Sequence, residues 1–355
     1  MVRRKISRKT PAALKAAIIL VFVATITALV FLFRIYSNIF SSVRIPSENN
    51  STLLFIPTGS DYDYVLDKLD NEGYIKNKEH FNWLAKKKNY PSHVKPGKYR
   101  IFNDMNNNEL INLLRSGRQE AVRFTFNSLR GTDELAGLTA RMLEPDSVML
   151  SETFRNPAIA EKYNFREETL PAVFIPNTYE FFWNTNPVGF MDRMFNEYTA
   201  FWTKERLGKA VKLGMDPVEV STLASLVELE SFHTAENAKI AGVFINRIRK
   251  GIPLQSDPTI IFAHKDYSIR RVLNKHKEII SPYNTYKHKG LPPGPICIPS
   301  IAAIDAVLNY EKHNFLYFCA KEDFSGYHNF AQTLAQHNKN ARLYQQALNR
   351  ARIFN

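Results

Sequence analysis

The sequence predicts an α+β protein with an N-terminal transmembrane helix, a small α/β module and a larger mixed α+β region. Three observations lead to this prediction. An uncharged apolar run lies near the N-terminus, at residues 16–33. Residues 52–118 alternate between strand-like and helix-like patterns, and residues 119–355 contain segments of both periodicities. A chain of 355 residues also exceeds one typical domain, so we expect two or three folded units.

The N-terminal segment is typical of an uncleaved membrane anchor. The 18 uncharged residues from Ala16 to Phe33 are about long enough to cross the hydrocarbon core of a bilayer. Basic residues precede this run and no acidic residue does, so the positive-inside rule places the N-terminus in the cytoplasm. A cleaved signal peptide is the alternative, but its apolar region would be shorter and a small-x-small site would follow it. We therefore expect a cytoplasmic basic tail at residues 1–15 and a transmembrane anchor at residues 16–34, with the rest outside.

The chain has a formal net charge of +13, and about half of it belongs to the N-terminal segment. Seven basic residues and no acidic residue lie between the N-terminus and Arg34, which leaves +6 for the remainder. The charge is therefore weak evidence for nucleic-acid binding, and no zinc-ligand pattern, P-loop or dinucleotide fingerprint is present. We expect no nucleic-acid partner, no metal site and no cofactor.

The two cysteines, Cys297 and Cys319, both lie on the predicted outer side of the membrane, where disulfides can form. Their spacing fits a disulfide and two free buried thiols equally well. A catalytic cysteine is not favoured, because no histidine lies at a motif-like spacing.

The segment after the anchor predicts a tether and then a folded module. Residues 35–51 contain Pro46-Ser47-Glu48-Asn49-Asn50, a composition that resists packing. Residues 52–118 then show the order strand, helix, helix, strand, helix. The predicted strands begin near Leu53 and Gly97, and the predicted helices cover residues 62–73, 78–88 and 107–116.

The larger region, residues 119–355, begins with a predicted strand at residues 121–126 and contains a long helical pattern at residues 192–211. Between them lies the aromatic segment PAVFIPNTYEFFW, residues 171–183. Aromatic side chains can contact a ligand, but a hydrophobic core is the more common use of such a segment. Further helical patterns occur at residues 301–308 and over the last 25 residues, and a hairpin is predicted between residues 315 and 330.

The stretch from Leu223 to Thr259 carries a candidate acid. Leu223, Leu226 and Val227 recur at helical spacing, and Glu230 continues the same face. Glu228 lies about 200° around the helix from Glu230 and should point away. Burial raises the pKa of a carboxyl, which keeps a proton available for general-acid catalysis. The same pattern fits a structural ion pair, for example between Glu230 and Arg247.

A second helix is predicted from Ala235 to Lys250, followed by the loop of residues 254–259, LQSDPT. Gly251 and Pro253 are typical of a helix end. Four of the six loop side chains can form hydrogen bonds, which would suit a polar ligand. An ordinary capped turn before the next element explains this composition more simply.

Several motifs together resemble the YceG-like, or MltG-type, family of endolytic murein transglycosylases. They are, in chain order, VELES, GVFINRIRKGIPLQSDPT, SPYNTY, KGLPPGPI and YHNF. The earlier segments GKYRI and FIPNTYEFFW resemble the LysM-like module and the central aromatic motif of the same family. The resemblance covers nearly the whole chain after the anchor. The chain departs from the family pattern at Asn177, where an aspartate is usual, and at Ser231, Phe232 and His233.

The resemblance implies a membrane-anchored lyase that cleaves the MurNAc–GlcNAc β-1,4 bond of peptidoglycan internally and leaves 1,6-anhydro-MurNAc ends. This activity would serve cell-wall synthesis and remodelling, including the termination of nascent strands. The resemblance also implies a bacterial cytoplasmic-membrane protein with a LysM-like module at residues 52–118 and a catalytic region at residues 119–355. Its partners would be peptidoglycan glycan strands and penicillin-binding peptidoglycan synthases.

In that family the second glutamate of an E-x-E motif is the catalytic acid, and this residue is Glu230 in the present sequence. The loop and the YNTY segment correspond to substrate-binding residues. These are Gln255, Ser256, Asp257, Thr259, Tyr283, Asn284, Thr285 and Tyr286.

Two alternative functions stay open at the level of the sequence. The first is a muramidase-type hydrolase that uses Glu230 and Asp257, because two-carboxylate hydrolysis needs a partner carboxyl about 5–10 Å away. The second is a non-catalytic glycan-binding scaffold, in which the small module would bind glycan chains or act as a spacer.

Overall fold

The computed structural model describes residues 12–45 and 50–351, and it confirms the α+β class. Contacts divide the chain into two compact units, one of residues up to 121 together with Phe182–Asn184, and one of residues 122–181 and 185–355. The first unit thus also contains a short segment from the second half of the chain. The six strands of the described residues form three separate two-stranded antiparallel sheets.

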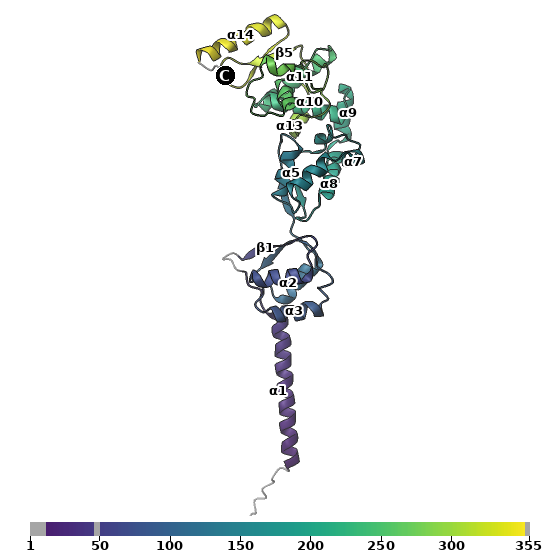
Figure 1. Cartoon of the computed structure of the whole chain (residues 1–355), viewed down its shortest axis with the longest axis vertical. Coiled ribbons are helices and arrows are strands. Elements are labelled where there is room, and N and C mark those ends of the chain that lie inside the picture. Colours follow the sequence, from purple (N-terminus) through teal and green to yellow (C-terminus); the bar gives the residue numbers. More distant parts are fainter. Residues whose placement is uncertain (1–11, 46–49, 352–355) are drawn as a thin grey trace, which may run out of the picture. The chain divides into compact units, whose positions relative to one another are not determined.

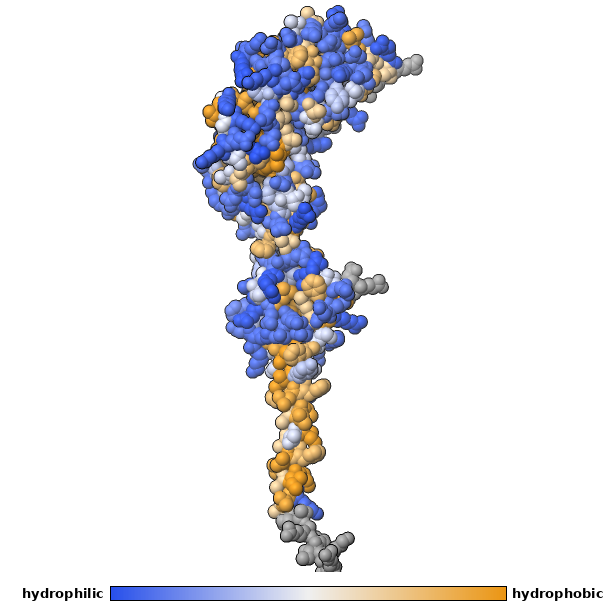
Figure 2. All heavy atoms as spheres, turned by 180° about the vertical axis from the view of Figure 1, so that it is seen from behind, coloured by the Kyte–Doolittle hydropathy of each residue, from blue (hydrophilic) through white to orange (hydrophobic). Residues whose placement is uncertain are grey.

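The first helix, α1 (Ala12–Phe40), is long and apolar, and none of its residues is buried. At 1.5 Å per residue its 29 residues are about 44 Å long, which exceeds the hydrocarbon thickness of a bilayer. The hydroxyls of Thr25 and Thr27 donate to the carbonyls of Val21 and Val23, so they have partners within the helix. Figure 2 shows the apolar surface that covers this helix. By length and composition α1 can cross a membrane, a test that a signal sequence also passes.

The helix continues into the expected tether, so the prediction of a loose segment from residue 35 is wrong. Val43 and Ile45 are buried, and the Val43 amide donates to the Met105 carbonyl at 2.9 Å. Val43 and Ile39 pack against the core of the first unit, and this apolar packing outweighs the local polar composition. Pro46–Asn49 and residues 1–11 of the expected basic tail lie outside the described residues.

The rest of the first unit has the predicted order of elements (Figure 1). Strands β1 (Ser51–Ile56) and β2 (Gly97–Phe102) pair antiparallel. The helices are α2 (Tyr62–Asn71), α3 (Lys78–Lys87) and α4 (Asn107–Ser116). They enclose a core whose fully buried side chains include Ile56, Leu69, Phe81, Tyr90 and Tyr99.

The second unit begins with β3 (Val122–Thr125), which pairs with β4 (Thr178–Phe181). Between these strands lie α5 (Thr132–Ala140), α6 (Ser147–Arg155), α7 (Pro157–Lys162) and the 3-10 turn η1 (Leu170–Val173). The rings of Phe181 and Phe190 stack at 5.0 Å, and Phe174 and Tyr179 are buried. Most of the aromatic segment of residues 171–183 therefore forms core, as its composition favoured.

The predicted long helix at residues 192–211 is two helices, α8 (Pro187–Phe201) and α9 (Lys204–Leu213). The chain turns at Trp202, whose side chain is buried, and the Thr203 side chain caps α9. Apolar residues keep a helical spacing on both sides of this turn, so periodicity alone does not reveal the break.

The centre of the second unit is α10 (Pro217–Glu230), which packs against α9, α11 (Asn237–Arg249), α12 (Asp257–His264) and α13 (Ile301–Leu308). Every residue from Val220 to Val227 is buried. The prediction of a single buried face is therefore wrong, because these helices together with η1 and the segment at Ile296 and Cys297 pack around α10 along this stretch. The remaining elements are the 3-10 turns η2 (Thr234–Glu236) and η3 (Asn274–Glu278), strands β5 (Tyr317–Ala320) and β6 (His328–Ala331), and α14 (Leu334–Arg350).

Cys297 is buried, Cys319 is partly exposed, and both are free thiols. Cys297 lies beside α10, with its sulfur 3.6 Å from the Ser225 carbonyl. Of the two possibilities that the sequence left open, the structure shows free cysteines.

Candidate active site

Glu230 is the last residue of α10, and its side chain is half-buried. A capping box of Asp216 and Glu219, with Pro217 at the first helical position, fixes the other end of this helix. Glu230 therefore sits at the end of a rigid element whose carbonyl dipoles point toward it. The negative end of a helix disfavours a carboxylate.

One hydroxyl binds the Glu230 carboxyl directly. Ser256 Oγ donates a hydrogen bond to Glu230 Oε1 at 2.5 Å, and Ser256 itself is buried. This donor at Oε1 favours Oε2 as the oxygen that carries a proton.

The surroundings raise the pKa of Glu230 to about 7. Burial is the largest cause, and the negative charge of Asp257 acts in the same direction. The hydrogen bond from Ser256 and the positive charge of Arg247 favour the carboxylate and oppose the rise. The carboxyl is thus close to half-protonated at neutral pH, the condition that suits a group that both donates and accepts a proton.

Arg247 is buried, but it binds carbonyl groups and not the acid. Its Nε donates to the Leu316 carbonyl at 2.6 Å, and its Nη1 donates to the carbonyls of Pro253 and Leu254. The ion pairs among the described residues do not include one between Arg247 and Glu230. The alternative of a structural Glu230–Arg247 ion pair is therefore wrong, and Arg247 instead ties the loop after α11 to the segment before β5.

Glu228 lies on another side of α10, where Ser300 Oγ donates to its Oε2 at 2.6 Å. Ser300 is the residue that caps α13. Glu228 points away from Glu230, as expected, but it is half-buried between helices and not free in solvent. The two glutamates therefore each bind a serine from a different segment of the chain.

The loop of residues 254–259 ends earlier than predicted, because α12 begins at Asp257. The Ser256 amide donates to Thr285 Oγ1 at 3.0 Å, and the Thr259 hydroxyl donates to the Ser256 carbonyl at 2.7 Å. Gln255 is exposed and has a φ of +54°, a left-handed conformation that is uncommon for residues other than glycine. The segment is thus a turn leading into a helix, and one of its side chains also binds the Glu230 carboxyl.

The YNTY segment lies against this turn. The Tyr286 hydroxyl donates to Asp257 Oδ1 at 2.5 Å. Burial raises the pKa of Tyr286 far above its ordinary value, so the phenol keeps its proton. Asn284 is fully buried, and its side-chain amide donates to the carbonyls of Lys277 and Ile279.

The structure thus sorts the predicted substrate-binding residues by position. Ser256 contacts the acid. Gln255 and Asp257, its neighbours in the chain, have exposed side chains, and Tyr286, which binds Asp257, has a partly exposed side chain. Thr259, Asn284 and Thr285 are buried and hold the turn.

Tyr283 lies apart from this group. It packs on Phe262, with 4.7 Å between ring centroids, and lines a separate cavity of about 930 Å³. Arg130 and Glu168 line the same cavity.

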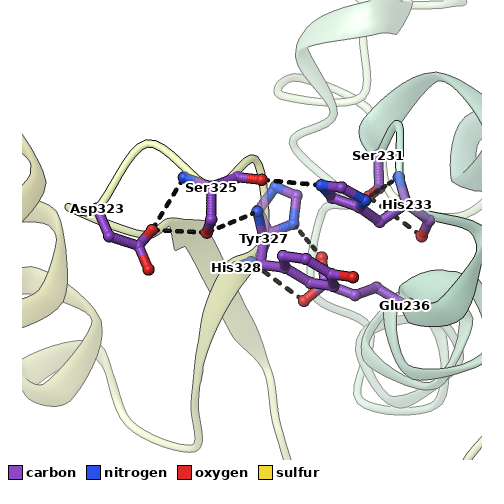
Figure 3. A network of polar contacts seen from close by, with 7 residues as sticks. All are labelled: Ser231, His233, Glu236, Asp323, Ser325, Tyr327 and His328. Carbon is purple, nitrogen blue, oxygen red and sulfur yellow. Dashed lines mark hydrogen bonds and ion pairs between the residues drawn. The ribbon is translucent and has the colours of Figure 1, made fainter.

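A second cluster beside Glu230 was not predicted from the sequence. The loop after α10 carries Phe232, His233 and Glu236, and the last two of these contact Tyr327 and His328 of the β5–β6 hairpin (Figure 3). The YHNF motif pointed to the hairpin residues, but Glu236 and His328 are 92 positions apart and no spacing rule joins them. Within the described residues no group of three or more His, Cys, Asp or Glu side chains is arranged to hold a metal ion.

The fold and the site define an α+β protein with a carboxyl of near-neutral pKa at the end of its central helix. A sequence model of the YceG-like family matches residues 54–343. An endolytic murein transglycosylase of Bacillus subtilis (strain 168) is 31% identical over 309 residues, which cover 80% of this chain and 82% of the relative. One from Streptococcus pneumoniae (strain ATCC BAA-255 / R6) is 31% identical over 300 residues, 75% of this chain and 53% of the relative, so this match spans about half of the streptococcal protein.

The crystal structure of a putative yceG-like protein from Listeria monocytogenes is also similar. Its TM-score is 0.56 at 25% identity, and the match covers 82% of this chain and 98% of that chain. The chain therefore belongs to the YceG-like family, as its motifs indicated.

Proposed function

We propose that the chain is a membrane-anchored endolytic lytic transglycosylase that cleaves the MurNAc–GlcNAc β-1,4 bond of peptidoglycan strands. Relatives of this similarity are named endolytic murein transglycosylases, which are lyases. The observation that carries the proposal for this chain is the pKa of about 7 at Glu230, raised by burial at the end of α10.

The reaction needs only this carboxyl. The Glu230 carboxylic acid protonates the glycosidic oxygen, the bond from that oxygen to the anomeric carbon breaks, and an oxocarbenium-like centre develops. The Glu230 carboxylate then takes the proton of the muramyl C6 hydroxyl while O6 bonds to the anomeric carbon. The products are a 1,6-anhydro-MurNAc end and a new GlcNAc end, and no water is consumed.

Ser256 supports the second half of this cycle. Its hydroxyl donates to Glu230 Oε1, a bond that strengthens when the carboxyl becomes charged. Burial and the Asp257 charge favour the protonated form that starts the reaction. These opposing influences keep the pKa near neutrality, where one group can serve as acid and then as base.

The other expected binding residues are proposed by position. Asp257 and Tyr286 form a hydrogen-bonded pair next to Ser256 and would bind or orient the sugar. Gln255 would contact the substrate from its exposed, left-handed position. Thr259, Asn284 and Thr285 would act through the turn that they hold, and Tyr283 would contact more distant parts of the substrate.

The proposed cellular setting follows from α1 and from the basic residues before it. The helix would anchor the chain in the bacterial cytoplasmic membrane, with the N-terminus inside and the catalytic region outside. The LysM-like module would contact glycan chains, and penicillin-binding synthases would be partners in ending nascent strands.

The isotope content of the products distinguishes this mechanism from hydrolysis. The full-length protein is incubated with purified glycan strands in water enriched in ¹⁸O, and the ends are analysed by mass spectrometry. Anhydro ends without ¹⁸O are expected. Reducing ends that contain ¹⁸O, lost in Asp257→Asn, would instead identify the muramidase that uses Glu230 and Asp257. Intact strands would leave the scaffold as the explanation.

A further inference from the structure

The loop between α10 and α11 carries a large aromatic side chain that is fully in solvent. Phe232 is 100% exposed and lies two residues after Glu230. Since successive Cα atoms are 3.8 Å apart, the Cα atoms of these two residues are at most about 8 Å apart. The loop segment that carries this exposed aromatic ring is therefore directly adjacent to the residue that carries the proposed acid.

The loop is held in place on both sides of Phe232. The His233 amide donates to Ser231 Oγ at 3.0 Å, and His233 Nε2 lies 2.9 Å from the Ser325 carbonyl. The His233 ring stacks on Tyr327 with 3.9 Å between centroids and an interplanar angle of 4° (Figure 3). His233 is thus fastened to the β5–β6 hairpin while its neighbour points into solvent.

A second contact fastens the same loop to the same hairpin. Glu236 accepts hydrogen bonds from the His328 amide at 3.1 Å and from His328 Nδ1 at 2.8 Å. The side chains of both residues are only about a tenth exposed, 10% and 11%. Two independent contacts therefore fix the loop, and the position of Phe232 is built into the fold.

The hairpin is shaped for this contact. Gly326 has a φ of +80°, and a Cβ at this position would lie 3.0 Å from His233 Nε2. Asp323 Oδ1 accepts hydrogen bonds from the amide and the hydroxyl of Ser325, which fixes the carbonyl that faces His233. A residue with a side chain in place of Gly326 would be strained and would push His233 away.

We propose that Phe232 is a substrate-contacting residue that stacks on the sugar ring next to the cleaved bond, with His233 and Tyr327 as positioning residues. This inference rests on the proposed function. Stacking would remove the exposed ring from water, and the C–H face of a pyranose is a flat apolar partner for it. The chain neighbours of Phe232, Ser231 and His233, are polar, and the proposed substrate of the nearby acid is a sugar, so a glycan fits this position better than an apolar protein surface.

Binding is measured with the full-length Glu230→Gln protein, which is expected to hold glycan strands without cutting them. Adding Phe232→Ala should weaken the affinity about ten-fold or more, because the stacked area is lost. Phe232→Trp keeps an aromatic face and should stay within about three-fold of the parent affinity. Val211→Ala is the matched control, since Val211 is 75% exposed on α9, near the opposite end of α10.

Kinetics separate contact from positioning in the active protein. Phe232→Ala should raise KM about ten-fold and change kcat less than three-fold. His233→Ala should raise KM by a smaller factor. His233→Phe keeps the stack on Tyr327 and should therefore have a KM close to that of the wild type. Unchanged melting temperatures would show that these variants are folded.

The inference is overturned if adding Phe232→Ala to the Glu230→Gln protein leaves its affinity for the strands unchanged, whatever the activity. An equal loss in Val211→Ala also overturns it, because the effect would then be general to exposed apolar residues. A wild-type protein that produces no anhydro ends instead refutes the proposed function, and the binding comparison still decides whether Phe232 contacts glycan.

Discussion

Replacing Ser256 with alanine removes the hydrogen bond that favours the ionised form of Glu230. The change is local, because the Ser256 side chain makes no capping bond to α12. The buried amide of Ser256, which donates to Thr285, is unaffected by the substitution. The variant therefore tests the electrostatics of the acid with little effect on the turn.

The magnitude follows from the strength of a hydrogen bond to a charged group. Such a bond contributes about 1.5–3 kcal/mol, and one pKa unit corresponds to about 1.4 kcal/mol. The pKa of Glu230, about 7 in the wild type, should therefore rise by about one to two units in Ser256→Ala. Because the protonated acid starts the reaction, activity falls as the pH rises through this pKa, and the fall should move to higher pH.

The assay is kcat/KM for release of anhydro products between pH 5 and pH 10, which reports the pKa of the free enzyme. Asp257→Asn should move the alkaline fall in the opposite direction, because the Asp257 charge raises the pKa of Glu230. Ser300→Ala is the matched control, since Ser300 makes the same kind of bond to Glu228. A profile in Ser256→Ala that does not move, or one that moves equally in Ser300→Ala, would refute the reasoning.

Two further predictions concern stability. The folded pKa of Glu230, about 7, exceeds the ordinary value of an unfolded glutamate, so the contribution of this group to stability is fully present below about pH 4 and is lost as the pH rises through 7. Glu230→Gln has no ionisable group at this position, so at pH 8 its free energy of unfolding should exceed that of the wild type by at most about 3 kcal/mol, which a higher melting temperature would show. At pH 4 the two proteins should melt alike. A difference in stability that does not depend on pH would contradict this. Gly242→Ala would place a Cβ 2.4 Å from the Glu311 carbonyl oxygen, so thermal denaturation should show a loss of about 1–3 kcal/mol. Gly208→Ala, with open space around its Cβ on α9, should be neutral or stabilising, and equal effects of the two changes would refute the packing argument.

Helical spacing identified Glu230 as the chemically distinct glutamate of the pair, and the structure bears out the raised pKa. The spacing did not reveal which groups raise the pKa of Glu230. The pKa of Glu230 is set by burial and the Asp257 charge, which raise it, against the hydrogen bond of Ser256, which lowers it. These partners are brought together by tertiary packing of α12 on α10, which periodicity does not encode.

The long-range polar contacts were also not predictable from the sequence. Arg247 was a reasonable partner for the acid, yet it binds backbone carbonyls that no side-chain pattern marks. The pairing of Glu236 with His328 joins two short polar segments 92 residues apart. The turn between α8 and α9 was missed because Trp202 fits a helical spacing although its backbone leaves the helix.

The central claim is that Glu230 transfers the proton in glycan cleavage. Glu228→Gln is the matched control, because Glu228 is half-buried in the same helix and also binds a serine. The decisive measurement is the rate of anhydro-end formation from purified strands by the wild type, Glu230→Gln and Glu228→Gln. The rate should fall about 10²–10⁴-fold in Glu230→Gln and stay within a few-fold in Glu228→Gln. An active Glu230→Gln protein, or an equal loss in both variants, would contradict the claim.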